Sequence, residues 1–451
     1  MNRRLPAPKF ADWLTNVPAE WDVERLGNVA KILFSNVDKH TIDGEIPVRL
    51  CNYVDVYKND RITHDIDFME ASAEAREIAR FQIHQGDVLA TKDSETPDDI
   101  AISSLVGEDL PGVLCGYHLA LIRPRQHLAH GPYLAWLHAC KTFRAQYEAH
   151  AVGVTRFGLS QAAFKEARVP LPSPPGQSNI AAYLDASCAA IDAAVAAKRH
   201  QVEILQALHR STITHAVTAG LDPSAKKKGS NTSWFRDLPS HWRIERLKDL
   251  ISKFVDYRGK TPEKTAEGIP LVTARNIRNG RIDFSLSQEY ISEVDYDDWM
   301  VRGFPEQGDV LVTTEAPMGE VASVEDTRIA LAQRIVLLKT NSAEMTNDYL
   351  RYFLLSAAGS AEIRRYATGS TALGIKARWL KIISVLVPPV EEQIAIARYL
   401  DGHCKQVEPL IQRIEEQIET LVAYRNSLIH ECVTGQRRVT QADLKRVGAS
   451  V

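Results

Sequence analysis

The segment Gln393-x-x-Ile396-x-x-Tyr399-Leu400-Asp401 decides the fold, and it repeats an earlier one, Gln177-x-x-Ile180-x-x-Tyr183-Leu184-Asp185. Prolines precede both copies: Pro174 and Pro175 come before the first, and Pro388 and Pro389 before the second. Proline ends the preceding strand and is tolerated in the first turn of a helix. Each copy therefore predicts the start of a long helix.

Apolar residues follow both segments at alternating spacings of four and three, over about 30 residues, which is the pattern of a coiled-coil seam. The seam positions are Leu184, Ile191, Val195, Val202 and Leu205 in the first copy, and Leu400, Val407, Ile411, Ile414, Ile418, Leu421 and Leu428 in the second. The shared register favours an antiparallel helix pair; the alternative is two amphipathic helices that each pack on their own domain. Lys198, His209 and Arg425 interrupt the seam, and we expect Pro409 to kink or restart the second helix.

Most of the chain repeats in the same way. Trp13, Pro18 and Trp21 recur as Trp234, Pro239 and Trp242; Gly86-Asp87-Val88-Leu89 recurs as Gly308-Asp309-Val310-Leu311; and Gly153-x-Thr155-x-x-Gly158 recurs as Gly369-x-Thr371-x-x-Gly374. The offset is 221 or 222 residues for the first two elements and 216 for the Gly-x-Thr and helix-start elements. A period this long indicates a duplicated domain with its connector, because solenoid repeats are about 20–50 residues long.

The two copies mix short β-like runs with helical ones, so the predicted fold is an α/β (α+β) tandem duplication. It consists of two globular domains separated by two long helices that form an antiparallel coiled coil. We expect domain 1 at 1–175, the first helix at 176–222, a linker at 223–233, domain 2 at 234–389, the second helix at 390–436 and a tail at 437–451. The linker assignment rests on the polar stretch from Lys226 to Ser233.

The composition is ordinary for a globular protein, with 451 residues, 45% hydrophobic residues and a net charge of −3. We find neither a membrane span nor a secretory signal, and the six cysteines are scattered without a C-x-x-C pair. This favours a cytoplasmic protein with reduced thiols and no zinc site. We interpret Cys188 and Cys404 as small core residues.

No catalytic signature is present: neither a phosphate-binding loop, nor a dinucleotide fingerprint, nor a zinc-protease or nucleophile-elbow motif. We therefore expect no catalytic residues, no bound cofactor and no metal. Positive charge instead gathers before each helix, around the two Gly-x-Thr-x-x-Gly elements. Glycine lets a backbone approach a phosphate, and Thr, Lys or Arg can bind it.

The candidate DNA contacts of this kind are Lys141, Arg144, Thr155 and Arg156 in the first copy, and Arg364, Arg365, Thr371, Lys376 and Arg378 in the second. The alternative is an ordinary turn with solvated charges. The Gly-Asp-Val-Leu element is interpreted as a turn that enters a buried strand. The residues after it differ between copies, which adds Lys92, Thr313 and Thr314 as candidates.

These motifs resemble the specificity subunits of type I restriction-modification systems. The Pro-x-x-Trp openings, the Gly-Asp-Val-Leu and Gly-x-Thr elements, and the segment from Glu391 to Asp401 carry the resemblance, as does the junction from Ala216 to Pro223. The matches run through both copies in order. Gly176 departs from the family pattern, which has Glu before the Gln at the helix start.

The resemblance implies two target recognition domains, each for one half of a bipartite, asymmetric site in double-stranded DNA. It also implies helices that set the gap and dock two methyltransferase subunits, with restriction subunits in the full complex. The partners, and not this chain, would use S-adenosylmethionine, ATP and Mg²⁺, in the cytoplasm of a prokaryote. The alternatives are a duplicated scaffold for protein assembly that does not read DNA, and a recognition protein of a phage or anti-restriction system.

Overall fold

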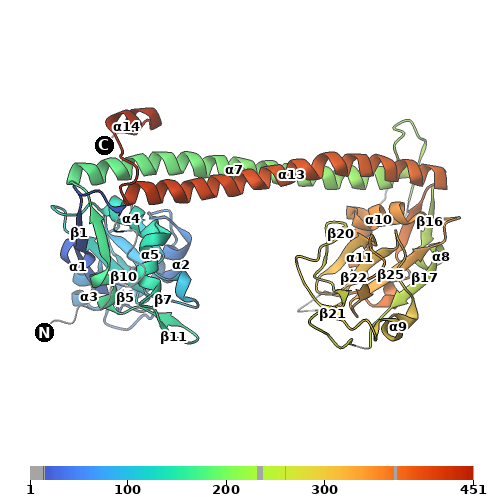
Figure 1. Ribbon diagram of the computed structural model, residues 1–451, viewed down its shortest axis with the longest axis horizontal. Coiled ribbons are helices and arrows are strands. Elements are labelled where there is room, and N and C mark those ends of the chain that lie inside the picture. Colours follow the sequence, from blue (N-terminus) through green and yellow to red (C-terminus); the bar gives the residue numbers. More distant parts are fainter. Residues whose placement is uncertain (1–13, 15, 231–236, 260, 370–372, 450–451) are drawn as a thin grey trace. The chain divides into compact units, whose positions relative to one another are not determined.

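The computed structural model describes residues 14, 16–230, 237–259, 261–369 and 373–449. The chain divides into two compact units, each built from two stretches of sequence. Unit 1 comprises Met1–Lys198 with Glu416–Val451, and unit 2 comprises Arg199–Glu415. The division runs through both long helices, so each unit contains one domain and half of each helix (Figure 1).

Unit 1 contains a five-stranded sheet in the order β2–β10–β6–β8–β4 and a smaller sheet in the order β5–β3–β9. The bounds are β2 Ala30–Phe34, β3 Ile46–Cys51, β4 Arg61–Ile62, β5 Met69–Ala73, β6 Val88–Thr91, β8 Ser103–Val106, β9 Val113–Cys115 and β10 Leu119–Pro124. The other elements are β1 Asp22–Arg25, α1 Leu26–Val29, α2 Tyr53–Lys58, α3 Ala75–Phe81, β7 Asp93–Ser94, α4 Gly131–Ala139, α5 Lys141–Glu148, β11 Val152–Gly153, β12 Phe157–Gly158, α6 Gln161–Glu166 and β13 Arg168–Leu171.

Unit 2 repeats this plan with a main sheet β17–β25–β22–β23 and a smaller sheet β21–β18–β24. The bounds are β17 Ile251–Asp256, β18 Ile269–Val272, β21 Tyr290–Ile291, β22 Val310–Thr314, β23 Met318–Ser323, β24 Ala330–Leu331 and β25 Ile335–Thr340. The other elements are β16 Arg243–Arg246, α8 Leu247–Leu250, β19 Ile277–Arg278, β20 Arg281–Ile282, α9 Tyr296–Trp299, α10 Asn347–Leu355, α11 Ala357–Arg365, α12 Ala377–Leu380 and β26 Ser384–Val387. The tandem duplication predicted from the sequence is confirmed.

The main sheet of each unit separates two hydrophobic cores, because successive side chains of a strand point to opposite faces. In β22, Val310 and Val312 face the core that contains α10 and the long helices, whereas Leu311 faces the core around the smaller sheet. β6 alternates in the same way: Val88 lies in one core and Leu89 in the other. The Gly-Asp pair before each strand forms the predicted turn, with φ values of 87° at Gly86 and 86° at Gly308.

The two long helices are α7, Pro174–Ala219, and α13, Val390–Val433. In unit 1 the first half of α7 packs on the second half of α13, as Leu184, Ile191 and Val195 share a core with Leu428. Lys198 Nζ also donates to Gln417 Oε1 at 2.6 Å. In unit 2, Ile213 near the end of α7 shares a core with Leu400 near the start of α13. The pairing is therefore antiparallel, as predicted, and α13 continues through Pro409 without the expected restart.

The repeated glutamine of the helix-start motif connects each helix to its domain. Gln393 is buried; its Nε2 donates to the carbonyls of Glu344 and Pro388, each at 2.9 Å, and its Oε1 accepts from the backbone N–H of Thr346 at 2.8 Å. Gln177 makes the equivalent three bonds in unit 1, to Leu128, Pro172 and His130. A buried amide with all these partners fixes the angle at which the helix leaves the sheet.

The repeated Pro-x-x-Trp element packs against a glycine just after a long helix. In unit 2, Gly220 has a φ of 76° and follows α7; a Cβ there would lie 3.3 Å from the Trp242 ring. In unit 1, Gly435 follows α13, and a Cβ would lie 2.3 Å from Pro18 Cδ. The positive φ and the close approach both require glycine. Trp13 and Trp234, quoted in the repeat, lie outside the described residues.

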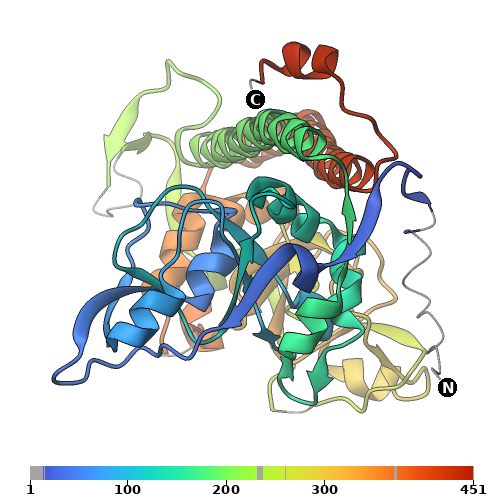
Figure 2. The same ribbon diagram turned by 90° about the vertical axis from the view of Figure 1, so that its left-hand side faces the viewer.

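Two segments differ from the sequence-based expectation. The stretch taken as a linker contains β14, Lys227–Gly229, which pairs antiparallel with β15, Asp237–Pro239. Lys228 Nζ donates to the carbonyl of Trp242 at 2.6 Å, so the lysine run is attached to unit 2. The expected tail contains α14, Gln441–Val447, whose Leu444 is buried in unit 1 (Figures 1 and 2). Short polar segments give no periodic signal, which is why the sequence did not predict these two elements.

Among the described residues, α7 is long and apolar enough to cross a membrane by length and composition, with an 18-residue window of mean hydropathy 1.5. A core helix of a globular domain passes the same test. The apolar side chains of α7 named above pack against α13 and the domain cores, which accounts for its composition without a membrane.

Candidate nucleic-acid interface

Two repeated sequence elements meet in space in both units. In unit 1, β12 pairs with β7, so the Gly-x-Thr turn closes against the residues that follow β6. In unit 2, Glu315 follows β22 and forms a bridge with Gly374. The strand that begins at Gly-Asp-Val-Leu therefore ends beside the Gly-x-Thr-x-x-Gly element in each copy. Figure 1 shows β7 and β11 on the side of unit 1 away from the long helices α7 and α13.

Asp93 joins two basic side chains at this end of unit 1. Its Oδ2 lies 2.6 Å from His118 Nδ1, and its Oδ1 lies 2.5 Å from Arg156 Nη2. The Asp93 side chain is 16% exposed, whereas that of Arg156 is 58% exposed. The carboxylate thus holds both side chains in place and leaves the guanidinium accessible.

Unit 2 carries a different acid–base pair at the matching positions. Arg334 immediately precedes β25, as His118 immediately precedes β10, and Glu315 follows β22 as Asp93 follows β6. Arg334 Nε lies 3.3 Å from Glu315 Oε1, and both side chains are about half exposed. The two units therefore share the backbone frame and differ in the polar groups that it presents.

Each acid–base pair adjoins a surface pocket. In unit 1 a pocket of about 380 Å³ is lined by Ser35, Asn36, Asp38, Lys39, His40, Lys92 and Tyr117. Lys92 Nζ lies 3.4 Å from the Ser35 carbonyl and 5.0 Å from the centre of the Phe34 ring. Burial lowers the pKa of Lys92, and the neighbouring Asp93 opposes this shift. The pocket therefore offers both hydrogen-bond donors and hydrogen-bond acceptors to a ligand.

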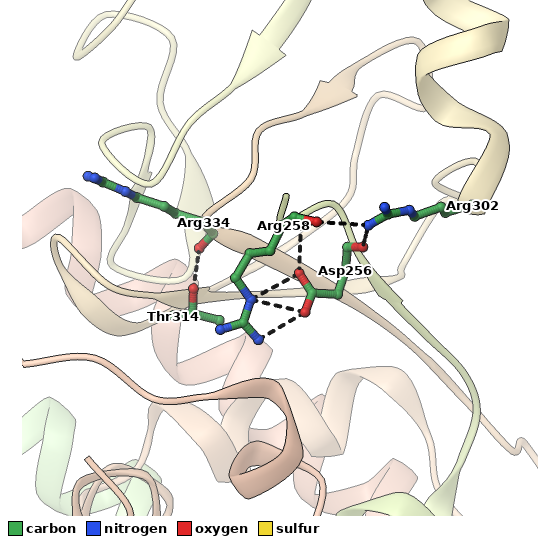
Figure 3. Close-up of polar contacts among 5 residues, drawn as sticks. All are labelled: Asp256, Arg258, Arg302, Thr314 and Arg334. Atoms are coloured by element: carbon green, nitrogen blue, oxygen red, sulfur yellow. Dashed lines mark hydrogen bonds and ion pairs between the residues drawn. The ribbon is translucent and has the colours of Figure 1, made fainter. Parts of the chain in front are cut away.

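The corresponding pocket of unit 2, of about 250 Å³, is lined by Thr261, Lys264, Thr273, Arg275, Gln333 and Arg334, among others. Figure 3 shows a group of arginines nearby. Asp256 holds Arg258 with hydrogen bonds from Nε at 3.0 Å and from Nη2 at 2.9 Å. Arg302 Nη1 donates to the carbonyls of Asp256 and Arg258, and the side chain of Arg334 points away from this group.

Thr313 and Thr314 lie inside the unit 2 sheet. Their exposed fractions are 0% and 2%. Thr313 Oγ1 accepts from the backbone N–H of Glu320 at 2.9 Å, and Thr314 Oγ1 donates to the Arg334 carbonyl at 3.2 Å (Figure 3). Neither side chain can touch a nucleic acid without opening the sheet; Thr314 holds the backbone of Arg334, and Thr313 holds that of Glu320. β-branched residues suit a buried strand end.

The other candidates of unit 1 lie on α5 and on the turn after it. Lys141 and Thr155 are exposed. Arg144 is partly buried, its Nε has no hydrogen-bond partner among the described residues, and burial lowers its pKa. Arg156 is thus the candidate that the structure brings together with Lys92 and the sheet end.

The basic candidates of unit 2 are divided between two places. Arg364 and Arg365 are exposed at the end of α11 and line a groove of about 1020 Å³ together with residues of α7 such as Arg210 and Thr214. Lys376 and Arg378 are exposed at α12, with the Arg378 guanidinium 5.1 Å from the centre of the Trp379 ring. Thr371 lies outside the described residues. The arginine pair therefore adjoins α7, whereas Arg334 is at the sheet end.

His118, Arg258, Arg302 and Arg334 were not among the candidates predicted from the sequence. A signal was available for two of them, because His118 and Arg334 both occupy the position just before the central strand β10 or β25. Chemically, this sheet end combines carboxylates, guanidiniums and an imidazole beside a glycine turn. Such groups can bind phosphates and the edges of bases.

Comparison with known proteins concerns the chain and its fold as a whole. The protein-family model called type I restriction modification DNA specificity domain matches residues 239–420 of this chain. The chain is 22% identical over 432 residues to a protein of Methanocaldococcus jannaschii provisionally named the type I restriction enzyme MjaX specificity subunit, which covers 94% of this chain and 95% of that protein. It is 24% identical over 383 residues to the type I restriction enzyme EcoKI specificity subunit of Escherichia coli K12, covering 77% and 78% of the two chains.

A solved structure described as the structural basis of complex assembly and conformational transition of the type I R-M system contains a chain with the same fold. The TM-score is 0.69 at 19% identity, and the match covers 93% of this chain and 99% of that one. The duplicated architecture, the two helices and the sequence relatives agree. Residues 239–420 match the type I specificity-domain family, and the chain over most of its length is similar to specificity subunits of type I restriction-modification systems.

Proposed function

We propose that the two domains read the two halves of one bipartite, asymmetric site in double-stranded DNA. The observation that carries this proposal is the matched sheet end, where Asp93 and His118 in unit 1 occupy the positions of Glu315 and Arg334 in unit 2. A shared frame with different polar groups is what two readers of different sequences require.

The chemistry of these groups suits both the reading of base edges and the binding of phosphates. An arginine can bind the major-groove edge of guanine with two hydrogen bonds, and a carboxylate can accept from cytosine. Arg156 and Arg334 are exposed, and each is already oriented by a carboxylate. The remaining exposed cations, such as Lys39 and Lys264, suit phosphate contacts, which fix register without reading sequence.

The helices supply the second part of the proposal. They set the gap between the half-sites and dock two methyltransferase subunits, to which restriction subunits attach. Exposed large hydrophobic side chains on both helices support this docking: Ile204 and Leu208 on α7 are 53% and 55% exposed, and Tyr399 and Leu410 on α13 are each 50% exposed. Apolar side chains that the fold leaves open commonly mark protein interfaces.

In this proposal the chain recognises the DNA sequence, and its partners carry out catalysis with S-adenosylmethionine, ATP and Mg²⁺ in the prokaryotic cytoplasm. Footprinting of the full chain with its methyltransferase subunit tests the proposal on DNA that carries the methylated motif. Two protected segments separated by an unprotected gap are expected. Sequence-independent protection, or none, would favour a protein-assembly scaffold that does not read DNA.

A further inference from the structure

One place in the unit 2 helix pair gathers groups that ligate metals. His209 lies on α7, and Cys404 and Glu408 lie on α13 one turn apart, so that these two share a helix face. One ligand atom from each of the three residues lies within 4.8 Å of the others. All three are partly buried.

Two imidazoles at this place lack hydrogen-bond partners. His209 Nδ1 and His403 Nε2 are buried, and neither has a partner among the described residues. The two rings stack with their centres 5.2 Å apart. Because buried polar atoms are nearly always satisfied, this pair indicates a missing ligand.

The internal repeat shows what unit 1 has at the same place. The residues of unit 1 that match His209, Cys404 and Glu408 are Arg425, Cys188 and Asp192. Arg425 Nε lies 3.0 Å from Asp192 Oδ1, and Arg425 Nη2 lies 3.3 Å from Asp60. A guanidinium therefore supplies positive charge between the helices of unit 1. In unit 2 a histidine replaces this arginine beside the acidic and thiol groups.

Neighbouring residues hold the ligands in position. Arg281 pairs with Oε2 of Glu408, which leaves Oε1 available to a metal. The hydroxyl of Tyr352 lies 3.5 Å from Cys404 Sγ and donates to Asp401 at 2.5 Å. Metal ligands in proteins are commonly oriented by second hydrogen bonds of this kind.

We propose that His209, Cys404 and Glu408 bind one Zn²⁺ that joins α7 to α13 in unit 2. Nitrogen, sulfur and oxygen ligands in a tetrahedral arrangement suit zinc, with His403 or water in the fourth position. Zinc ligand atoms lie about 2.0–2.3 Å from the metal, so side-chain rotation on binding would bring the three atoms, which lie within 4.8 Å of one another, around the ion. Cys404 releases its proton to solvent as its thiolate binds. The site departs from the sequence-based expectation of no metal.

Metal titration of the full chain tests the site directly. After chelator treatment and desalting, ZnCl₂ is titrated by calorimetry, and CoCl₂ is titrated by absorption spectroscopy. We expect one ion per chain, with cobalt bands typical of tetrahedral geometry and of a thiolate ligand. Zinc should also raise the thermal unfolding midpoint, because it binds the folded state.

His209→Arg is the decisive variant, since it gives unit 2 the cation that unit 1 already has and therefore preserves the helix pair. It should weaken zinc binding about a hundredfold or more, and Cys404→Ala should also remove the thiolate band. Cys188→Ala is the matched control and should bind zinc as the native chain does. The proposal is overturned if the native chain binds no zinc, if His209→Arg and Cys404→Ala bind it equally well, or if Cys188→Ala loses it.

Discussion

Lengthening both helices by whole heptads tests whether the helix pair sets the distance between the half-sites. Lys198 contacts Gln417, so the antiparallel register places Val202 of α7 opposite Arg413 of α13. A seven-residue insertion after Val202 preserves the apolar seam, but on its own it would leave α13 too short to match. The change is therefore a pair of seven-residue insertions, one after Val202 and one after Arg413.

The magnitude follows from helix geometry. Seven residues add about 10 Å, which corresponds to roughly three base pairs of DNA. DNA turns once in about 10–10.5 base pairs, so three base pairs also rotate the second half-site by roughly 100°, whereas a heptad rotates the helix by only about 20°. Two heptads should therefore give the weakest binding. Three heptads add about 31 Å, or roughly nine base pairs, which returns the two half-sites to nearly the same relative orientation around the DNA axis as in the native spacing.

The assay is methylome sequencing of cells that express each variant with the methyltransferase subunits, together with binding titrations on DNA of each spacer length. Both half-sites should persist while the spacer grows by about three base pairs per heptad, and affinity should recover with three heptads. The single insertion in α7 serves as the control and should abolish activity by misaligning the pair. An active variant with an unchanged spacer would refute the idea that the helices act as a ruler.

Three further predictions concern single residues. Gln393→Leu removes three buried hydrogen bonds and should lower the free energy of unfolding by about 3 kcal/mol in chemical denaturation, whereas the exposed Gln201→Leu should change it by less than about 0.5 kcal/mol. Burial lowers the pKa of His138 to about 4, so between about pH 6.5 and pH 4 the unfolded chain binds a proton that the folded chain does not. The free energy of unfolding should therefore be highest above about pH 6.5 and fall by about 3 kcal/mol toward pH 4. His138→Gln should flatten this pH dependence. If Arg156 and Arg334 contact phosphates, replacing either by Ala should lower the salt slope of DNA binding by about one. If they contact bases, each replacement should cost roughly 1–3 kcal/mol of binding free energy and relax the sequence preference at one position of the site. Unchanged affinity in both variants would place the DNA face elsewhere.

The sequence predicted the helices and their pairing well because a seam repeats many times. Each of Leu184, Ile191, Leu400 and Leu428 added to one periodic signal, and the matched register of the two copies indicated an antiparallel pair. The turn at Gly86 was predictable for a local reason, since glycine before a buried strand has few other roles. The β14 strand and the α14 helix were not predictable, because neither carries a periodic pattern.

The site was harder to predict because it depends on contacts between residues distant in sequence. Asp93 and Arg156 belong to different repeated elements, and nothing local shows that these elements meet. His209 and Cys404 come together only because the helices pair antiparallel. Charge clustering selected Arg156 as a candidate but not Arg334, whose position is marked by its place before β25 and not by basic neighbours.

The most direct test of the central claim, that each domain reads its own half-site, is methylome sequencing of the complex carrying a paired change in unit 2 alone. Glu315→Gln with Arg334→Gln alters the polar groups at the unit 2 sheet end and leaves Asp93 and His118 untouched. The account predicts that one half of the methylated motif relaxes or changes, while the other half and the spacer stay as they were. A change in both halves, or an unchanged motif in an active complex, would contradict it.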